Sequence, residues 1–231
     1  MANLCIIPAR GGSKRIPRKN IKDFLGKPII AYSIEAALES GVFSKVIVST
    51  DDPEIAEVAK KYGAEVPFMR SVQNSDDYAT TADVLEEVLN NFIGLNTIFS
   101  AACCIYPTAP FTNSQILQKG FQKLIECDAD SVLPMVAFEY PVWRGLRKNR
   151  NNKAEMIWKE HLNTRSQDLE PVYHDAGQWY WFDVDKFLKT SKVFTENTIG
   201  IELSSLQVQD IDNEQDWHIA ELKYGYLQSL K

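Results

Sequence analysis

The sequence predicts an α/β protein built on a three-layer, mostly parallel, Rossmann-like sheet. Short apolar runs, which suit strands buried on both faces, alternate along the chain with amphipathic segments of helical period. A chain of 231 residues suits one such domain, so residues 1–231 are taken as a single domain. The unusual polar loops follow strands, which is where sheets of this kind bind ligands.

The first half of the chain carries the alternation most clearly. It is expected to run as a strand at 4–7, a long loop at 8–27, a helix at 28–40, a strand at 46–49, a helix at 53–63, a strand at 64–68 and a helix at 80–92. Proline opens the second helix, acids precede lysines along it, and Gly63 ends it, in agreement with helix-end preferences. This order predicts helices on both faces of a parallel sheet.

The second half starts with a strongly apolar run at 97–107, which predicts a central strand. A helix at 113–127, strands at 131–136, 177–185 and 200–208, and a terminal helix at 217–230 are expected to follow. Residues 138–174 break the rhythm with many charges, two tryptophans and little periodicity. We expect hairpins or a flap there, and not a second domain.

Composition narrows the class of protein. The formal net charge is -6 and the sequence pI is about 5.2, which argues against general nucleic-acid binding. No apolar stretch approaches the roughly 20 residues of a membrane span, and no signal segment precedes the first strand. A cytoplasmic protein without a membrane partner is expected. The four cysteines lack metal-ligand spacing.

The loop after the first strand, "LCIIPARGGSKRIPRKN", gathers five cations beside two glycines, namely Arg10, Lys14, Arg15, Arg18 and Lys19. It lacks the spacing of a P-loop, and the proline after the second arginine excludes the immediate helix of a dinucleotide fingerprint. The glycines permit close backbone approach to a polyphosphate that the cations would neutralise. A solvated basic loop with ordinary surface ion pairs is the alternative.

Several motifs, in the same order, resemble the cytidylyltransferases that make CMP-linked sialic acids. They are "IPARGGSKRIPRKNI", "GKPIIAYSIEAALESGVFSKVIVSTDD", "EIAEVAKKYGAEVPFMR", "NSDD", "YPTAP" and "QDIDNEQDW". Within that family, "IYPTAPF", "YPVWRG" and "DAGQWYWF" are most similar to pseudaminic acid cytidylyltransferases of bacterial surface-glycan pathways such as flagellin glycosylation. The resemblance covers nearly the whole chain.

The resemblance implies a nucleotidyltransferase-type sheet and a reaction. The anomeric hydroxyl of a nine-carbon acidic sugar, here pseudaminic acid, attacks the α-phosphate of CTP, and pyrophosphate leaves. It also implies Mg²⁺ and a homodimer in which residues 138–174 serve dimerisation and the sugar site. Two alternatives stay open: the same transfer to N-acetylneuraminic or legionaminic acid, and a non-catalytic nucleotide-sugar-binding protein.

The resemblance implies the nucleotide site. Its residues are Ala9, Arg10, Gly11, Gly12, Ser13, Arg15, Lys19, Asn20, Ser75, Asp76, Tyr106 and Thr108, with Arg10, Lys19 and Asp210 as the catalytic set. For Ser75 and Asp76, helix or turn capping is an equal alternative.

Asp210 and Asp212 stand at i and i+2, which places both carboxylates on one face of an extended segment. The resemblance makes them Mg²⁺ ligands, and a helix cap at Asp212 is the alternative. The sugar site implied by the resemblance contains Thr108, Arg144, His174, Gln178 and Tyr180, with Arg147 an alternative to Arg144. Tyr106, Thr112 and Ala176 stand where sialic acid enzymes usually carry glutamine, arginine and asparagine, which favours a modified sugar.

Overall fold

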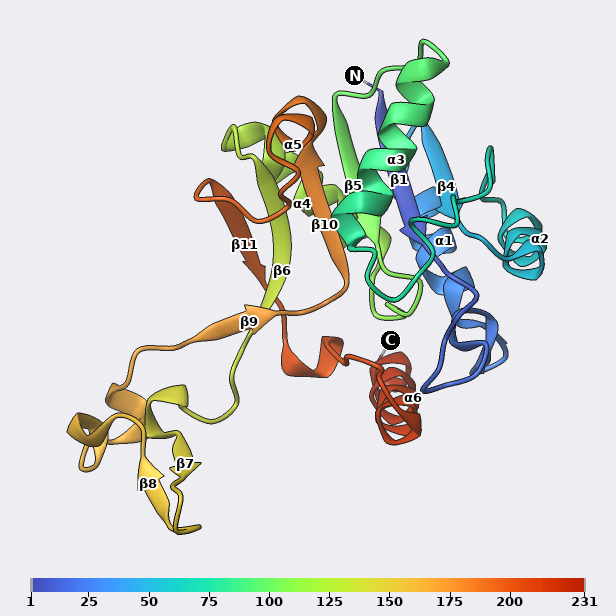
Figure 1. Cartoon of the computed structure of the whole chain (residues 1–231). Coiled ribbons are helices and arrows are strands. Elements are labelled where there is room, and N and C mark those ends of the chain that lie inside the picture. The colour runs from blue at the N-terminus through green and yellow to red at the C-terminus, as the bar shows by residue number, and fades with distance from the viewer. Residues whose placement is uncertain (1, 231) are drawn as a thin grey trace.

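A seven-stranded sheet forms the middle layer of the computed structural model, which describes residues 2–230 (Figure 1). The strand order is β11-β6-β10-β5-β1-β4, and β9 pairs with β6. The strands are β1 (Asn3–Pro8), β4 (Lys45–Ser49), β5 (Ala101–Ile105), β6 (Ser131–Ala137), β9 (Tyr173–Asp175), β10 (Trp179–Asp183) and β11 (Thr198–Glu202). All run in one direction except β9 and β10, which are antiparallel to their neighbours, so the predicted mostly parallel sheet is confirmed.

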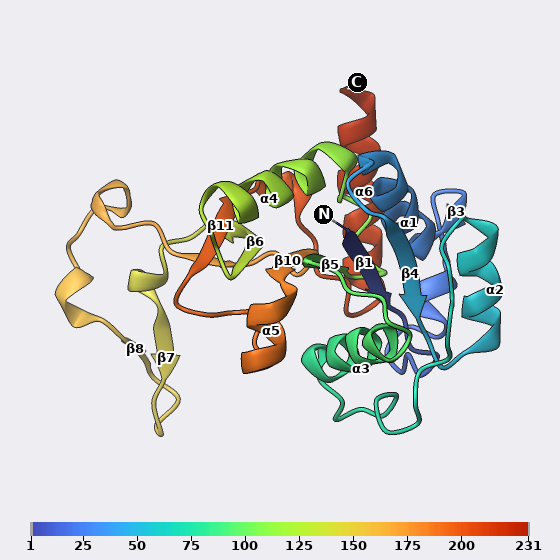
Figure 2. The ribbon, with the colours of Figure 1, turned by 90° about the horizontal axis from the view of Figure 1, so that it is seen from above.

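Helices cover both faces of this sheet, as Figure 2 shows from above. The α-helices are α1 (Ile29–Ser40), α2 (Pro53–Lys61), α3 (Thr81–Gly94), α4 (Ser114–Glu126), α5 (Val184–Thr190) and α6 (Glu214–Ser229). One core joins alternate strand residues to α1, α2 and α4, and a second joins the intervening strand residues to α3 and α5. In β1, for example, Cys5 and Ile7 face the first core and Leu4 and Ile6 the second. This alternation is what a strand buried on both faces requires.

Short elements complete the chain. They are the two-residue strands β2 (Asp23–Phe24) and β3 (Lys27–Pro28), the hairpin strands β7 (Leu146–Lys148) and β8 (Ala154–Met156), and the 3₁₀ turns η1 (Lys19–Ile21), η2 (Val142–Arg144), η3 (Lys159–His161), η4 (Ser166–Asp168) and η5 (Ser205–Gln207). Among residues 2–230, no helix is both long and apolar enough to cross a membrane.

Three predicted elements are corrected by the structure. The strand expected at 64–68 is a single bridge between Ile47 and Glu65, and the chain then leaves the sheet towards Pro67, which has no N–H for a ladder. The strand expected at 177–185 ends early, because the Asp183 side chain caps the unpredicted helix α5. The strand expected at 200–208 begins and ends earlier in the sequence, as β11 at Thr198–Glu202. The turn η5 occupies Ser205–Gln207 of the predicted range.

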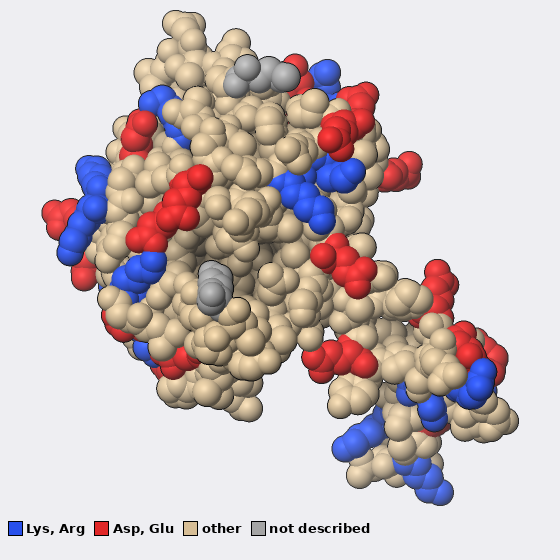
Figure 3. All heavy atoms as spheres, turned by 180° about the vertical axis from the view of Figure 1, so that it is seen from behind, with Lys and Arg blue, Asp and Glu red and all other residues tan. Residues whose placement is uncertain are grey.

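Residues 138–172 leave the sheet and project from the body of the molecule (Figures 1 and 3). The β7–β8 hairpin forms the far end of this excursion, where Lys and Arg side chains gather in Figure 3. Trp143 packs edge-on against Trp158 at 5.5 Å between ring centroids, and its indole donates to the Glu170 carbonyl at 2.8 Å. These contacts stabilise the excursion internally, without the sheet.

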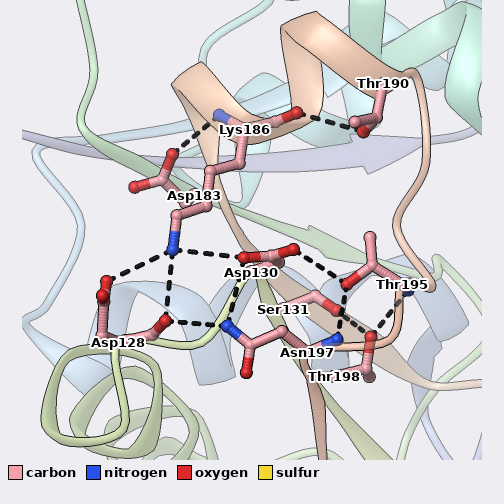
Figure 4. Close-up of polar contacts among 9 residues, drawn as sticks. All are labelled: Asp128, Asp130, Ser131, Asp183, Lys186, Thr190, Thr195, Asn197 and Thr198. Carbon is pink, nitrogen blue, oxygen red and sulfur yellow. Dashed lines mark hydrogen bonds and ion pairs between the residues drawn. The ribbon is translucent and has the colours of Figure 1, made fainter.

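A polar network fixes the end of the sheet where β6 and β11 begin (Figure 4). Lys186 of α5 lies 3.2 Å from carboxylate oxygens of both Asp128 and Asp130. Asp130 also accepts from the Thr195 hydroxyl at 3.0 Å and from the Asn197 amide at 3.2 Å. Because β6 and β11 run parallel, this network lies at the edge of the sheet opposite to their carboxyl ends. The network therefore does not occupy the carboxyl edge.

Candidate active site

The first loop and the segment before α6 meet at the carboxyl edge of the sheet. Trp217 of α6 is fully buried and packs edge-on against Phe24 at 5.5 Å, within a cluster that includes Ile16, Phe111 and Ile211. Figure 1 shows α6 beside this loop, although almost 200 residues separate them in the sequence. Burial of large aromatic rings is the main physical reason for this docking.

This docking brings the predicted phosphate loop and the predicted metal segment together. Lys19 Nζ donates to the Ile211 carbonyl at 2.6 Å, and Arg15 Nη2 lies 2.7 Å from Asp212 Oδ1. Burial lowers the pKa of Lys19, which the carboxylates of Asp212 and Asp210 partly offset. Burial and the charge of Asp212 raise the pKa of Asp210, against the effect of Lys19. The loop and the aspartates therefore form one electrostatic unit.

The alternative of a helix cap at Asp212 is wrong. Asn213 caps α6, because its side chain accepts from the N–H groups of Gln215 and Asp216, and Asp216 completes a capping box. The Asp212 carboxylate is released from the helix terminus and faces Arg15 instead.

A cleft of about 320 Å³ opens beside this unit. Of the predicted nucleotide residues, it is lined by Arg10, Ser13, Arg15, Lys19, Asn20, Asp76, Tyr106 and Thr108. Ala9 is buried and extends the pairing of β1 by donating to Ser49. Gly11, Gly12 and Ser75 belong to the same segments but do not line the cleft among the described residues.

The two glycines of the first loop differ in their surroundings. A Cβ on Gly11 would lie 2.7 Å from Asp52 Oδ2, whereas a Cβ on Gly12 would meet no heavy atom of residues 2–230 within 4 Å. Asp52 caps α2 and pairs with Arg18, so the loop is held against the start of that helix. Asn20 donates to the Arg10 carbonyl at 2.9 Å and fixes the loop from within.

On the opposite wall of the cleft, an acidic side chain forms ion pairs with two cations of the first loop. Arg10 Nη1 donates to the Asp76 carbonyl at 2.8 Å and to the Asp77 carboxylate at 2.9 Å. Lys14 pairs with the same carboxylate, and its hydrogen bond is the leading cause of the lowered pKa of Asp77. The Asp76 carboxylate accepts from two backbone N–H groups at 2.8 Å, and the Ser75 hydroxyl donates to Ser71. Turn capping by Ser75 and Asp76 is therefore present, and their contact with nucleotide stays a prediction.

A second cleft, of about 370 Å³, lies between the end of β6, the turn after β9 and α6. It contains His174 and Asp210, whereas Asp212 pairs with Arg15, which lines the first cleft. The Tyr180 hydroxyl donates to Asp175 Oδ2 at 2.6 Å, and the Tyr180 ring meets that of Tyr106 at 5.4 Å. Burial, then Tyr106 and Asp175, raises the pKa of Tyr180. Tyr106 lines the first cleft and Asp175 lines the second, so Tyr180 contacts one lining residue of each cleft.

Of the five predicted sugar residues, His174 is the one that lines this second cleft in the described part of the chain. Thr108 lines the first cleft, Tyr180 lines neither, and Gln178 and Arg144 lie elsewhere. Gln178 is buried, donates to the Gln207 carbonyl at 2.5 Å and lines a third cavity beside α4. Arg144 is exposed on the excursion and, within the described chain, lines neither cleft. Its neighbour Arg147 pairs with Glu155 across the β7–β8 hairpin at 2.7 Å. Within the described chain, neither arginine lines the first or the second cleft, so their contact with a sugar stays a prediction.

The aspartate segment could hold a divalent cation only if the substrate supplied further oxygen ligands. No group of three or more His, Cys, Asp or Glu side chains suited to metal is present in residues 2–230. Mg²⁺, however, is commonly bound by one or two carboxylates plus phosphate oxygens and water. Asp210 and Asp212 supply that number of carboxylates beside the cations expected to hold phosphates.

Sequence reasoning missed five charged residues of the clefts, among them Glu139 and Asp175, which line the second cleft. Arg70 is buried, donates to the Ser49 hydroxyl at 3.1 Å and lines the first cleft, where burial lowers its pKa. Asp77 holds Arg10 and Lys14. Lys223 of α6 lines the second cleft. Arg70 ends a quoted family motif, which was a usable signal, whereas Lys223 sits in an ordinary helical pattern.

Comparison with known proteins decides the family, since the cytidylyltransferase family model matches residues 4–219. The chain belongs to the cytidylyltransferase family. It is 46% identical over 224 residues to pseudaminic acid cytidylyltransferase of Campylobacter jejuni subsp. jejuni serotype O:2, covering 97% of each chain. It is 33% identical to CMP-N,N'-diacetyllegionaminic acid synthase of Legionella pneumophila, covering 96% of this chain and 95% of that one.

The fold of this cytidylyltransferase is also found among solved structures. CMP:2-keto-3-deoxy-manno-octonic acid synthetase, solved as a complex with CTP, superimposes with a TM-score of 0.70 at 18% identity, over 99% of this chain and 100% of that one. At this identity the likeness supports the nucleotidyltransferase-type fold alone. Family membership makes cytidylyl transfer the chemistry of the chain.

Proposed function

We propose that this cytidylyltransferase transfers CMP from CTP to the anomeric hydroxyl of pseudaminic acid and releases pyrophosphate. The observation that carries the proposal is the meeting of the first loop with the aspartate segment, in which Lys19 Nζ lies 2.6 Å from the Ile211 carbonyl. The relative that is 46% identical over 97% of both chains carries the name of that sugar.

Nucleotidyl transfer depends on alignment and charge neutralisation more than on covalent chemistry. Arg10 and Lys19 lie on the wall of the first cleft, where they would bind the triphosphate and stabilise the leaving pyrophosphate. The Asp77 carboxylate now paired with Arg10 would be exchanged for phosphate oxygens. Tyr106 and Thr108 follow β5 and would contact the nucleotide from the other side.

Asp210 and Asp212 would hold Mg²⁺ against the phosphates. When bound, the cation neutralises charge on the α-phosphate. Asp212 lies against Arg15 and Asp210 borders the second cleft, so the aspartates stand where triphosphate and sugar would meet. Mg²⁺ dependence follows, and removal of divalent cations with EDTA should stop turnover.

The second cleft is the proposed sugar site. His174 and Ala176 line it, and Tyr180 lies behind Asp175 at its wall. Ala176 leaves more room than the asparagine of sialic acid enzymes, which suits a sugar with a different acyl pattern.

We also propose a homodimer formed through the excursion. Large apolar side chains on it, including Tyr140, Leu146 and Leu162, are 61–84% exposed, and exposed apolar groups of this kind favour association. A second copy would bring Arg144 within reach of a sugar site, which one copy alone does not. We expect the enzyme to act in the cytoplasm. Light scattering after gel filtration should give twice the mass of 26.2 kDa.

Pyrophosphate release tests the reaction. The enzyme is incubated with CTP, Mg²⁺ and, separately, pseudaminic, N-acetylneuraminic or N,N'-diacetyllegionaminic acid. The proposal predicts the highest kcat/KM with pseudaminic acid. A higher value with another sugar would assign the alternative substrate, and CTP binding without release for any sugar would indicate a non-catalytic protein.

A further inference from the structure

The second cleft contains one anchored cation that the mechanism above does not use. Lys223, on α6, donates from Nζ to the Val208 carbonyl at 2.8 Å and to the Ser205 carbonyl at 3.1 Å. An ammonium group has three donors, so one N–H remains after these two bonds. The residue is partly buried and lines the cleft.

The charges that line this cleft indicate what the remaining N–H of Lys223 could bind. Among the described residues that line it, Lys223 is the one lysine or arginine, whereas Glu139, Asp175 and Asp210 contribute carboxylates. An acidic sugar entering here meets repulsion except near the ammonium. A carboxylate withdrawn from water without a cation is strongly disfavoured.

The surrounding backbone keeps Lys223 in place. Its carbonyl partners belong to η5 and the residue that follows, directly before the aspartate segment. Fixing the amine in this way removes side-chain entropy before substrate arrives, so less is lost on binding. Burial lowers the pKa of Lys223, because the charged amine loses contact with water, and the carboxylate of Glu139 partly offsets that effect.

We propose that Lys223 binds the carboxylate of the sugar substrate from within the same chain. This inference rests on the proposed transfer to an acidic nine-carbon sugar and adds its anchoring residue. Arg144 lines neither cleft of its own chain and would reach a sugar only from a second copy, so the proposal assigns the charge contact to α6 and leaves the excursion to other contacts.

The test compares the natural sugar with an analogue whose carboxylate is replaced by a carboxamide. A hydrogen bond to a charged group is worth roughly 10- to 100-fold in binding. Wild-type enzyme should therefore prefer the carboxylate by about that factor in kcat/KM, through KM. Lys223→Gln keeps a donor for the carbonyls but loses the charge, so it should lose the preference while KM for CTP stays unchanged. Lys223→Arg should retain most of it.

Lys119→Met is the matched control, because Lys119 lines the third cavity and is exposed. It should keep the wild-type preference. A Lys223→Gln enzyme that still prefers the carboxylate by the wild-type factor would overturn the assignment, and so would loss of the preference in Arg144→Gln alone. If Lys223→Gln fails to fold, Lys223→Arg decides, since its charge must preserve the preference. Wild-type enzyme inactive with every acidic sugar would instead refute the proposed function.

Discussion

Replacing Gly11 by alanine separates the packing role of the first loop from its binding role. The new Cβ would lie 2.7 Å from Asp52 Oδ2 and 3.1 Å from Asp52 Cβ, closer than ordinary van der Waals contact. Asp52 cannot turn aside freely, because Oδ1 accepts from Glu54 and Ile55 N–H groups at 2.9 and 3.1 Å and Oδ2 pairs with Arg18. The substitution must therefore disturb the helix cap or shift the loop.

The magnitude follows from those contacts. Overpacking costs about 1–3 kcal/mol, and loss of an aspartate cap costs about 0.5–2 kcal/mol. Because relief of one removes part of the other, we expect a total of about 1–3 kcal/mol. For a chain of this size each kcal/mol lowers Tm by about 2–4 °C. Urea denaturation should show a lower midpoint with the same slope.

Gly12→Ala, at the adjacent residue, is the matched control for Gly11→Ala. Its Cβ enters open space, and the backbone conformation suits alanine, so stability should stay within about 0.5 kcal/mol of wild type. Because Gly12 belongs to the predicted phosphate loop, this variant should weaken CTP binding in calorimetry. An unchanged midpoint for Gly11→Ala, or a larger loss of stability for Gly12→Ala, would refute the reasoning.

Three further predictions concern the aspartates and α6. Asp210→Asn should lower kcat at least 100-fold at unchanged urea midpoint, because it removes a proposed metal ligand, whereas Asp185→Asn on α5 should not. Trp217→Ala removes a fully buried ring and should cost about 3–5 kcal/mol in urea denaturation, with weaker CTP binding. Asp130→Asn should destabilise the protein at pH 7. Its hydrogen bond to Lys186 holds the pKa below the ordinary value, so the wild-type advantage should be full above about pH 4 and fade as the pH falls further.

Each of these three predictions can be contradicted by one result. Full activity of Asp210→Asn would remove it from the metal site. Unchanged stability of Trp217→Ala would mean that the ring does not dock α6. A difference for Asp130→Asn that grows below pH 4 would have the wrong sign for a carboxylate whose folded pKa is lowered.

The strands of the main sheet could be predicted because their signal is local. Apolar runs such as that of β5 leave little choice but burial on both faces, and the amphipathic helices between them fix a layered α/β fold. The antiparallel direction of β10 could not be predicted in this way. It depends on where the excursion returns the chain, at β9, and no local pattern encodes that path.

The candidate site was predictable in its parts but not in its contacts. The motifs identify the phosphate loop and the aspartate segment, whereas their meeting depends on burial of Trp217 against Phe24, a contact between distant parts of the chain. The same holds for the cap, where Asn213 and Asp212 are equivalent by residue type and only the backbone path distinguishes them. Lys223 looks like any helix-surface lysine until the 205–208 segment folds over it.

A crystal structure with CTP and Mg²⁺ tests the central claim most directly. The account predicts the triphosphate in the first cleft, within hydrogen-bond distance of Arg10 and Lys19, with the cation held by Asp210 or Asp212. A triphosphate bound elsewhere, or a cation that contacts neither aspartate, would contradict it.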